Sequence, residues 1–304
     1  MTAARLDGAS LARTIREELR DEITRLVARG MRPGLGVLLV GDDPASAAYV
    51  RSKTLACEEL GVFHETQRLP QTATTDAVLG RIAEYNARTD VHGILVQLPL
   101  PRQVNSALAL ESVDPKKDVD GFHPTNVGLL VQKRARFVSC TPAGIMELLV
   151  RNGVELRGRR AVVVGRSDIV GKPMALLLLH ADATVTIAHS RTPDLGAVTR
   201  EADLLIAAAG RAGLLRAEHV KPGAVVVDVG MNWIKDEQQA RELLTPTRFA
   251  SFLEKGTALV GDVHHPSVSA VASALTPVPG GVGPLTIAYL MKNTVASAAR
   301  FAGA

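Results

Sequence analysis

The sequence predicts an α/β protein that is built on parallel sheets and divided into two domains. Patterns typical of strands and helices alternate along most of the 304 residues, which is the order that produces a parallel sheet with right-handed crossovers. Hydrophobic residues make up 46% of the chain, but aromatic residues only 3%. The core must therefore rely on aliphatic side chains, as buried parallel strands do. At about 150 residues per domain, the length favours two domains.

Apolar periodicity and capping signals place the elements of the first half. Asp43 followed by Pro44 is an N-cap with a first-turn proline, and it opens a helix that Gly61 ends. Gly30 ends the preceding helix. The expected elements are a helix over 8–29, a strand over 35–40, a helix over 44–60, a strand over 64–69, a helix over 75–87 and a strand over 93–100 that runs into a proline-rich turn.

The alternation continues in the second half, where Thr141 and Pro142 form another N-cap pair. The proline- and glycine-rich segment TPVPGGVGP, before the last helix, indicates that the chain returns to the first domain. We therefore expect one domain over 1–139 together with 280–304, and a second over 140–279. The expected elements are a helix to about Arg151, strands over 161–165 and 184–190 around a helix over 172–180, a further helix, strands over 203–210 and 224–230, and a final helix from Pro284 to about Arg300.

Composition and charge argue against several functional classes. The 35 basic and 31 acidic residues are mixed along the chain and give a formal net charge of +4, so there is no basic run of the kind that binds nucleic acid. The two cysteines have no metal-ligand spacing. No long apolar run predicts a membrane span, and the first 21 residues lack the apolar stretch of a signal peptide. We expect a cytoplasmic protein without a metal, a nucleic-acid partner or a membrane partner.

The segment after the strand over 161–165 is a candidate dinucleotide site. Gly165 and Gly171 lie where a strand turns into a helix, and this turn lets the backbone and the helix N-terminus approach a phosphate. The pattern departs from GxGxxG, because Ser167 occupies the middle position, and an ordinary strand-to-helix turn remains an alternative. The next strand ends in Ser190 and Arg191, where an NAD site carries an acid. A hydroxyl and a cation suit a 2′-phosphate, so the sequence favours NADP.

Polar residues of the first half form a second candidate site. Tyr49 and Lys53 are four residues apart and share one helix face. A desolvated lysine has a lowered pKa and can transfer protons near neutral pH; a solvated lysine remains the alternative. Gln97 ends a strand at the position where α/β sheets bind ligands. Asp118 and Asp120 lie in a turn-rich loop, where an aspartate often only braces the turn.

At these residues the chain resembles the bifunctional methylenetetrahydrofolate dehydrogenase/cyclohydrolases of the bacterial FolD type. Matching stretches follow the order of that family over essentially the whole chain, and the most specific are GILVQLPLP and PGGVGPLT. The stretches are GDDPASAAYVRSK (41–53), GILVQLPLP (93–101), KDVDGFHPTNVG (117–128), CTPAGIMELL (140–149), VVGRSDIVGKPMA (163–175), ATVTIAHSRT (183–192), VKPGAVVVDVG (220–230) and TPVPGGVGPLT (276–286).

The resemblance implies an NADP-dependent oxidation of 5,10-methylenetetrahydrofolate to the methenyl cation, followed by hydrolysis to 10-formyltetrahydrofolate, in one-carbon folate metabolism. It also implies a Rossmann-like NADP-binding domain and a catalytic, folate-binding α/β domain that flank a cleft, in a homodimer. By the same resemblance, Lys53 matches the catalytic lysine and Tyr49 its YxxxK partner. Gln97 matches the glutamine that contacts the lysine, and Asp120 matches the aspartate that anchors the pterin ring.

In the second domain the resemblance implies that Arg166, Ser167 and Ser190 contact the cofactor, with Arg166 and Ser190 near the 2′-phosphate. The loop from Pro279 through Gly280 to Gly283 matches the loop between cofactor and folate. Departures from the family pattern occur at Arg88, at Met231-Asn232-Trp233 and at His264-His265.

Three other functions remain open from the sequence. A dehydrogenase without the hydrolytic step is disfavoured by the intact Tyr49, Lys53 and Gln97. A shikimate-type NADP dehydrogenase would share the two-domain plan, but it would not carry PGGVGP. A non-catalytic nucleotide-binding dimer is disfavoured because polar candidate residues are present in both halves of the chain.

Overall fold

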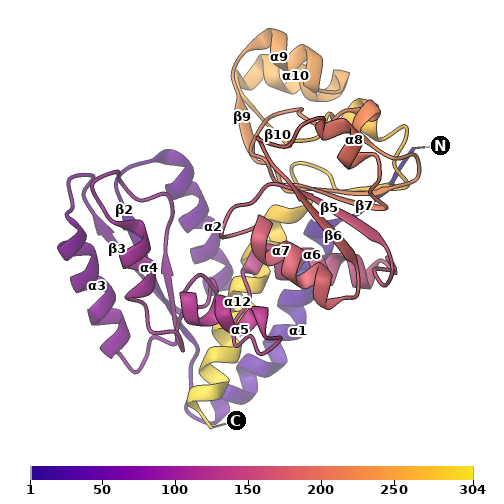
Figure 1. Ribbon diagram of the computed structural model, residues 1–304. Helices are drawn as coiled ribbons and strands as arrows, with labels where there is room; N and C mark the ends of the chain where they lie inside the picture. The colour runs from indigo at the N-terminus through magenta and orange to yellow at the C-terminus, as the bar shows by residue number, and fades with distance from the viewer. Residues whose placement is uncertain (1, 304) are drawn as a thin grey trace. The chain divides into compact units, whose positions relative to one another are not determined.

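A computed structural model describes residues 2–303 and contains two principal parallel sheets (Figure 1). The chain divides accordingly into two units. The smaller-sheet unit comprises Ala12–Cys140 and the chain from Thr286 onward. The larger-sheet unit comprises the chain up to Leu11 and Thr141–Leu285. Among the described residues, no helix is both long and apolar enough to cross a membrane.

The smaller-sheet unit has a three-stranded sheet of order β3-β2-β4. β2 is buried along its whole length, and it pairs in parallel with both neighbours. In Figure 1, helices lie on both sides of this sheet. The elements are α1 (Gly8–Ala28), β2 (Gly34–Val40), α2 (Pro44–Leu60), β3 (Phe63–Leu69), α3 (Thr75–Ala87), β4 (Gly93–Val96), α4 (Ser106–Glu111), α5 (Pro124–Val131) and α12 (Val282–Phe301).

The predicted capping signals of α2 are confirmed. The Asp43 side chain accepts a hydrogen bond of 2.7 Å from the Ser46 amide, and Gly61 ends the helix in the left-handed conformation. β4 is shorter than the predicted strand over 93–100, because it ends at Val96. Pro99 and Pro101 lack an N–H group, so the ladder cannot continue through this segment.

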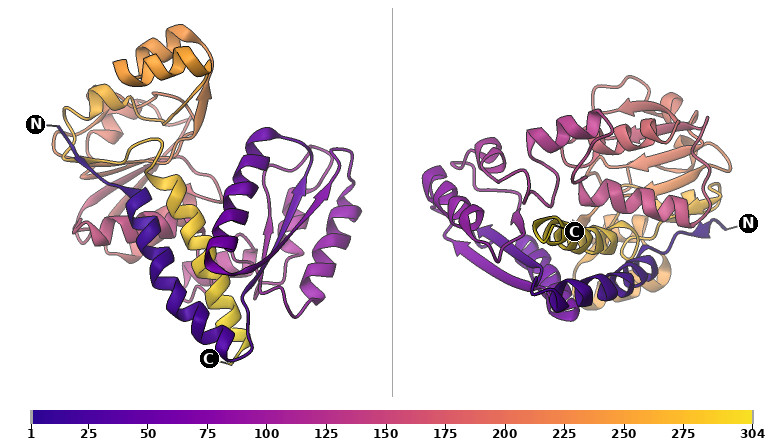
Figure 2. Two further views of the ribbon diagram at one scale, coloured as in Figure 1. Left: turned by 180° about the vertical axis from the view of Figure 1, so that it is seen from behind. Right: turned by 90° about the horizontal axis from the view of Figure 1, so that it is seen from below.

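The last helix, α12, packs in the smaller-sheet unit from Thr286 onward. Its Ser297 hydroxyl donates to the carbonyls of His92 and Lys116, at 2.6 and 3.0 Å. Both views of Figure 2 show α12 and α1 side by side within this unit. A segment close to the end of the chain therefore supports the loop that precedes Asp120.

The larger-sheet unit has a six-stranded parallel sheet of order β1-β11-β8-β7-β5-β6. β5 pairs with the edge strand β6 on one side and with β7 on the other, so the direction of winding reverses between β5 and β7. The elements are β1 (Ala4–Arg5), α6 (Cys140–Arg151), β5 (Arg160–Val164), α7 (Gly171–His180), β6 (Thr184–Ala188), α8 (Leu195–Thr199), β7 (Leu204–Ala207), a 3-10 turn η1 (Ala217–His219), β8 (Val225–Asp228) and β11 (Ala274–Leu275).

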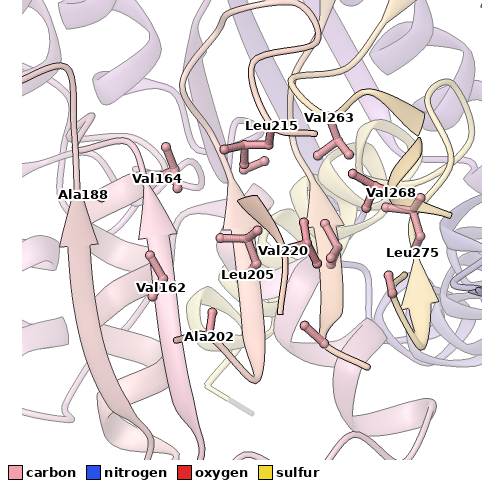
Figure 3. Packing of buried hydrophobic residues seen from close by; sticks show 14 residues of the cluster. Val162, Val164, Ala188, Ala202, Leu205, Leu215, Val220, Val263, Val268 and Leu275 are labelled. Atoms are coloured by element: carbon pink, nitrogen blue, oxygen red, sulfur yellow. The ribbon is translucent and has the colours of Figure 1, made fainter. Parts of the chain in front are cut away.

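Small aliphatic side chains form the core of this sheet. Figure 3 shows Val162, Val164, Leu205 and their neighbours packed together on adjacent strands. The core of this sheet thus consists of aliphatic side chains, as the low aromatic content of the sequence predicts.

The region between β8 and β11 contains a satellite hairpin with three helices that the sequence analysis does not predict. β9 (Asn232–Ile234) pairs antiparallel with β10 (Ala258–Val260). The helices are α9 (Glu237–Leu243), α10 (Pro246–Lys255) and α11 (His265–Val268). Ile234, Leu243 and Phe252 belong to a separate small core here.

The first residues of the chain contribute to the larger sheet. β1 pairs in parallel with β11, with Ala4 opposite Ala274 and Arg5 opposite Leu275. The chain up to Leu11 therefore belongs to the larger-sheet unit, whereas the sequence analysis expects residues 1–139 in one domain. A two-residue edge strand leaves no periodic signal in a sequence, because alternation needs four or more residues to be visible.

Candidate active site

Lys53 is a buried lysine that is hydrogen-bonded to a side-chain amide. α2 carries it, its side chain is only 8% exposed, and its Nζ donates to Oε1 of Gln97 at 3.0 Å. Gln97 follows β4, and its own amide nitrogen donates to the Leu98 carbonyl at 2.7 Å, which fixes the orientation of the amide. Burial lowers the pKa of Lys53, and the negative charge of Asp120 opposes this shift.

A second buried lysine shows what a structural lysine looks like in this fold. The Lys117 ammonium donates to the backbone carbonyls of Tyr85, Asn86 and Arg88 at the end of α3. All three carbonyls lie at the C-terminal end of the helix, where donors within the helix run out, and the Tyr85 carbonyl also accepts from the Arg88 amide at 3.3 Å. Lys117 therefore caps a helix, whereas Lys53 faces a side-chain amide and a carboxylate and keeps donors available.

Asp118 and Asp120 differ sharply in their contacts. Asp118 is buried and accepts hydrogen bonds from the amides of Phe122 and His123 and from the Asn126 side chain, at 3.2, 2.9 and 2.7 Å. It is the residue that braces the turn. Asp120 is partly exposed, and a cysteine thiol, Cys140 Sγ, donates to its Oδ1 over 3.8 Å.

Asp120 has an unusually basic carboxylate. Burial, as the largest cause, and the neighbouring Asp118 raise its pKa to about 6, although Lys53 acts in the opposite direction. A bridge between Ile94 and Asp118 places the Asp120 loop alongside β4. The structure thus brings Lys53, Gln97 and Asp120 together at the carboxyl end of β4.

Two further residues hold this loop, and the sequence analysis does not assign them to the site. The Asn293 side chain on α12 donates to the carbonyls of Val119 and Val138, at 2.8 and 3.2 Å, and to Cys140 Sγ at 3.6 Å. Cys140 is buried, and the Val119 carbonyl, at 3.4 Å from Sγ, is a nearer acceptor for its single S–H group than Asp120 is. Asn293 is distant in sequence from the loop it holds, so no local motif points to it.

Tyr49 lies one helical turn before Lys53 on α2 and is partly exposed. Burial raises the pKa of its hydroxyl, so the phenol stays protonated at neutral pH. The i, i+4 relationship that the sequence predicts is confirmed by the helix.

In the larger-sheet unit, Gly165 and Gly171 form a tight strand-to-helix turn. Gly165 has a φ of +135°, and a Cβ there would lie 2.1 Å from the Ala208 carbonyl oxygen. A Cβ on Gly171 would lie 2.4 Å from the Gly165 carbonyl oxygen. The Ser167 hydroxyl accepts from the amides of Val170 and Gly171, at 3.2 and 3.3 Å, at the start of α7. We call this turn, from Gly165 to Gly171, the cradle. A side chain at either glycine would fill it.

The cations of the second candidate site lie next to this cradle. β5 and β6 are paired in register, with Val164 opposite Ala188, so the segments after both strands emerge at the same edge. Arg166 follows β5, and Ser190 and Arg191 follow β6; all three are exposed. Among the described residues neither arginine forms an ion pair with a carboxylate. Their charges therefore remain available to an anion beside the N-terminus of α7.

The loop before α12 is built by close backbone approaches. Gly280 has a φ of +99°, and its carbonyl accepts from the Ala9 amide at 2.8 Å. The Arg248 guanidinium donates to the Val278 carbonyl at 2.8 Å. Gly283 lies in the first turn of α12, and a Cβ there would come no nearer than 4.0 Å to Met231 Sδ. The backbone between Pro279 and Gly283 is thus held in place from both sides.

A pair of buried carboxylates organises the neighbouring loops. Asp228 accepts from the amides of Gly230, Asp262 and Val263, at 2.9, 2.9 and 3.0 Å. Burial first, and then Asp262, raise the pKa of Asp228 to about 7. A Cβ on Gly261 would lie 1.7 Å from an Asp228 oxygen, so only glycine permits this approach.

Asp262 is fully buried and holds a different loop. It accepts from the amides of Ala209, Gly210 and Arg211, at 2.6, 2.9 and 2.8 Å, in the segment after β7. The two carboxylates therefore fix the loops after β7 and β8, next to the position where the winding of the sheet reverses. Ligands of doubly wound sheets bind at this position.

The fold and these residues define a dinucleotide-binding α/β enzyme with a lysine, amide and carboxylate cluster on its other unit. The family model described as "Tetrahydrofolate dehydrogenase/cyclohydrolase, catalytic domain" matches residues 6–120. The model described as "Tetrahydrofolate dehydrogenase/cyclohydrolase, NAD(P)-binding domain" matches residues 139–302. The chain belongs to the tetrahydrofolate dehydrogenase/cyclohydrolase family.

Relatives named bifunctional protein FolD match along the whole chain. The protein of Solibacter usitatus is 54% identical over 300 residues, which cover 98% of each chain. The protein of Geobacillus thermodenitrificans is 49% identical over 302 residues, which cover 99% of each chain.

Solved structures agree with the fold. The bifunctional FolD enzyme of Campylobacter jejuni superposes with a TM-score of 0.89 at 46% identity, over 98% of this chain and 99% of that one. The Trypanosoma brucei methylenetetrahydrofolate dehydrogenase-cyclohydrolase, complexed with NADP and an inhibitor, superposes with a TM-score of 0.90 at 39% identity, over 99% of this chain and 98% of that one.

Proposed function

We propose that Lys53, Gln97, Tyr49 and Asp120 carry the folate chemistry of this enzyme, and that the cradle of Gly165 and Gly171 with its neighbouring cations carries the cofactor. The enzyme oxidises 5,10-methylenetetrahydrofolate with NADP and hydrolyses the methenyl product to 10-formyltetrahydrofolate. The observation that carries the residue assignment is the hydrogen bond from the buried Lys53 ammonium to Gln97, beside a carboxylate of raised pKa.

The cofactor residues fit a dinucleotide that carries a 2′-phosphate. The backbone of Gly165 and the first turn of α7 receive the phosphates, because no side chain blocks them and the helix N-terminus favours negative charge. Ser190 stands where an acidic residue would repel a 2′-phosphate, and Arg166 and Arg191 supply unpaired positive charge at the same edge. When bound, NADP supplies the acceptor for the hydride that leaves the methylene carbon.

The residues of the smaller-sheet unit orient the folate and move protons. Asp120 accepts hydrogen bonds from the N–H groups of the pterin ring, and this fixes the ring and the reacting carbon relative to Lys53. The loop from Pro279 through Gly280 to Gly283 lines the substrate with backbone rather than with side chains, which suits a flat ring.

The hydrolytic step needs a group that both accepts and returns a proton. Water attacks the methenyl carbon of the cation, and neutral Lys53 takes a proton from it. The C–N bond to the pterin nitrogen then breaks, and the Lys53 ammonium returns a proton to that nitrogen. The remaining hydroxyl proton of the tetrahedral intermediate is released to water as the formyl carbonyl forms. Burial serves this cycle because it lowers the pKa of Lys53 and increases the neutral fraction. Gln97 keeps the amine in place with its carbonyl oxygen.

Absorbance assays with the purified enzyme test this proposal. Methenyltetrahydrofolate formation is followed with NADP or NAD, and methenyl disappearance is followed without cofactor. The proposal expects strong preference for NADP and a hydrolysis rate above the spontaneous background. Equal use of NAD and NADP would refute the assignment of Ser190 and Arg191.

We further propose that the enzyme is a homodimer. β6 is an edge strand of the larger sheet, and its Ile187 is 41% exposed; Leu179 of α7, the helix before β6, is 56% exposed. An open edge with apolar side chains suits pairing with a second copy. Analytical ultracentrifugation of an Ile187→Asp variant tests this: the proposal expects a monomer, and an unchanged mass would refute it. The cytoplasmic location stays a prediction.

A further inference from the structure

A cavity in the larger-sheet unit is lined by cations without acidic residues. Its volume is about 270 Å³, and it lies between β1, α10, α11 and the segment from Pro277 to Pro279. Three of its lining residues carry positive charge or can carry it: Arg5, Arg248 and His265. No aspartate or glutamate is among the described residues that line it. The cofactor cradle described above shares none of these residues.

Arg248 is held in a fixed position but is not neutralised. It is partly buried, and its two terminal nitrogens donate to the carbonyls of Val278 and Leu259. These two bonds leave three of the five guanidinium N–H groups for other partners. Burial lowers the pKa of Arg248, which is the mark of a cation that the protein does not compensate.

His265 and Arg5 are the other two nitrogen-bearing side chains that line the cavity. Burial lowers the pKa of His265, and the positive charges of Arg248 and Arg5 and the neighbouring His264 lower it further. Within residues 2–303, no hydrogen bond from another residue reaches the His265 ring. Arg5 forms a loose ion pair of 3.6 Å with Asp7, which does not line the cavity. Its guanidinium lies against the backbone of Gly280, 3.7 Å from the position of a Cβ there.

These observations describe two guanidinium groups and one neutral imidazole around one cavity, and the partly buried Arg248 cation has no carboxylate among the cavity's lining residues to offset its loss of hydration. Such a cost is relieved when an anion enters, because each charge-assisted hydrogen bond then forms without further rearrangement of Arg248. We propose that this cavity is a binding site for the oxyanion group of a small ligand, either a phosphate or a carboxylate. Arg248 provides the fixed donor, and Arg5 and His265 close over the anion.

Isothermal titration with inorganic phosphate, and separately with succinate, tests the proposal. The enzyme is saturated with NADP, so that the cofactor site does not compete for the anion. The variants are Arg248→Met, His265→Phe and Arg5→Met, and the matched control is Arg241→Met, whose arginine pairs with Glu237 on α9 and does not line the cavity. His265→Phe retains a ring of similar size, so it keeps the test valid if Arg248→Met fails to fold.

The proposal expects binding of at least one of the two anions, weakened about tenfold or more in each cavity variant, and unchanged in the control. Binding of phosphate alone identifies a phosphate-bearing ligand, and binding of succinate alone identifies a carboxylate-bearing one. Absence of binding by both anions would overturn the proposal. Binding that Arg241→Met weakens as much as His265→Phe would also overturn it.

Discussion

Asp118 and Asp120 stand two residues apart in one loop and differ in their hydrogen-bond partners. Asp118 is buried, and its carboxylate oxygens accept hydrogen bonds from two backbone amides and from the Asn126 side chain. Asp120 is partly exposed beside Lys53, with a cysteine thiol as a distant donor. The first aspartate makes the loop rigid, and the second keeps acceptors that a ligand can use.

Replacing Lys53 by methionine should separate the two activities. The side chain keeps its volume but loses the proton-transfer group, which typically contributes about 100- to 10,000-fold to a rate. We expect hydrolysis of methenyltetrahydrofolate to fall to the spontaneous background, and dehydrogenase activity to fall less, because Asp120 and the cofactor residues still position the reactants. Absorbance without cofactor measures the first, and Lys116→Met at an exposed position is the control. A variant that hydrolyses at the wild-type rate would exclude Lys53 as the proton carrier.

The KM for methylenetetrahydrofolate should depend on pH through Asp120. Its pKa is raised to about 6, so the carboxylate is ionised above that pH and becomes protonated as the pH falls through it. Protonation converts one acceptor oxygen into a donor, and the KM should therefore rise below about pH 6. Asp120→Asn should show a high KM with no such pH dependence, whereas Asp76→Asn on the surface of α3 should behave as wild type. A wild-type KM in Asp120→Asn at every pH would contradict the role of Asp120.

Asn293 should act as a positioning residue for the folate. Asn293→Leu keeps the shape but removes the donors to the carbonyls of Val119 and Val138, which flank Asp120 and Cys140. We expect the KM for methylenetetrahydrofolate to rise about tenfold, because the loss of these hydrogen bonds costs about 1.5 kcal/mol of binding free energy. The KM for NADP should stay unchanged.

Steady-state kinetics measure both constants. Thr294→Val is the matched control, because its hydroxyl donates within α12 to the Leu290 carbonyl and does not reach the loop. If Thr294→Val raises the KM for folate as much as Asn293→Leu does, the effect belongs to the stability of α12 and not to the position of Asp120.

Cofactor preference should depend on the edge formed by β5 and β6. Arg191→Ala and Arg166→Ala each remove a charge-assisted contact of about 1.5–3 kcal/mol, which is roughly ten- to a hundredfold in affinity. We expect the KM for NADP to rise and that for NAD to stay nearly constant. Arg157→Ala, at an exposed position of the same unit, is the control. Parallel increases in both KM values would show that the arginines do not recognise the 2′-phosphate.

Asp228→Asn should destabilise the larger-sheet unit. The carboxylate accepts N–H bonds on both oxygens, and an amide would turn an NH₂ group toward one of these donors. A buried donor without an acceptor costs about 1–3 kcal/mol. Thermal unfolding of the variant should show a lowered Tm, and Glu254→Gln on the exposed face of α10 should not. An unchanged Tm in Asp228→Asn would mean that the loops are held without this carboxylate.

The parts of the fold that the sequence predicts well are those with local signals. Asp43 with Pro44 and Gly61 delimit α2, and α3 has the predicted bounds of 75–87. The hairpin of β9 and β10 with α9 and α10 was not predicted, because its strands have three residues each and are stabilised by contacts such as those among Ile234, Leu243 and Phe252. Such short strands have no detectable periodicity.

The same distinction holds for the site. Lys53 and Tyr49 share a helix face, so their spacing is informative, and Gln97 ends a strand. Local sequence does not distinguish Asp118 from Asp120, because both lie in one turn and only the tertiary contacts assign their roles. Asn293 has no local signal at all, since its partners lie more than a hundred residues earlier in the chain.

The long-range support by α12 has a consequence for the order in which this chain is made. The ribosome synthesises β2, β3 and β4 well before Asn293 and Ser297, which donate to the carbonyls of Val119, His92 and Lys116. Likewise, β1 has no strand to pair with until β11 has been synthesised. The smaller-sheet unit therefore reaches its final form only after α12 has been synthesised, and the larger sheet is complete only after β11 has been synthesised.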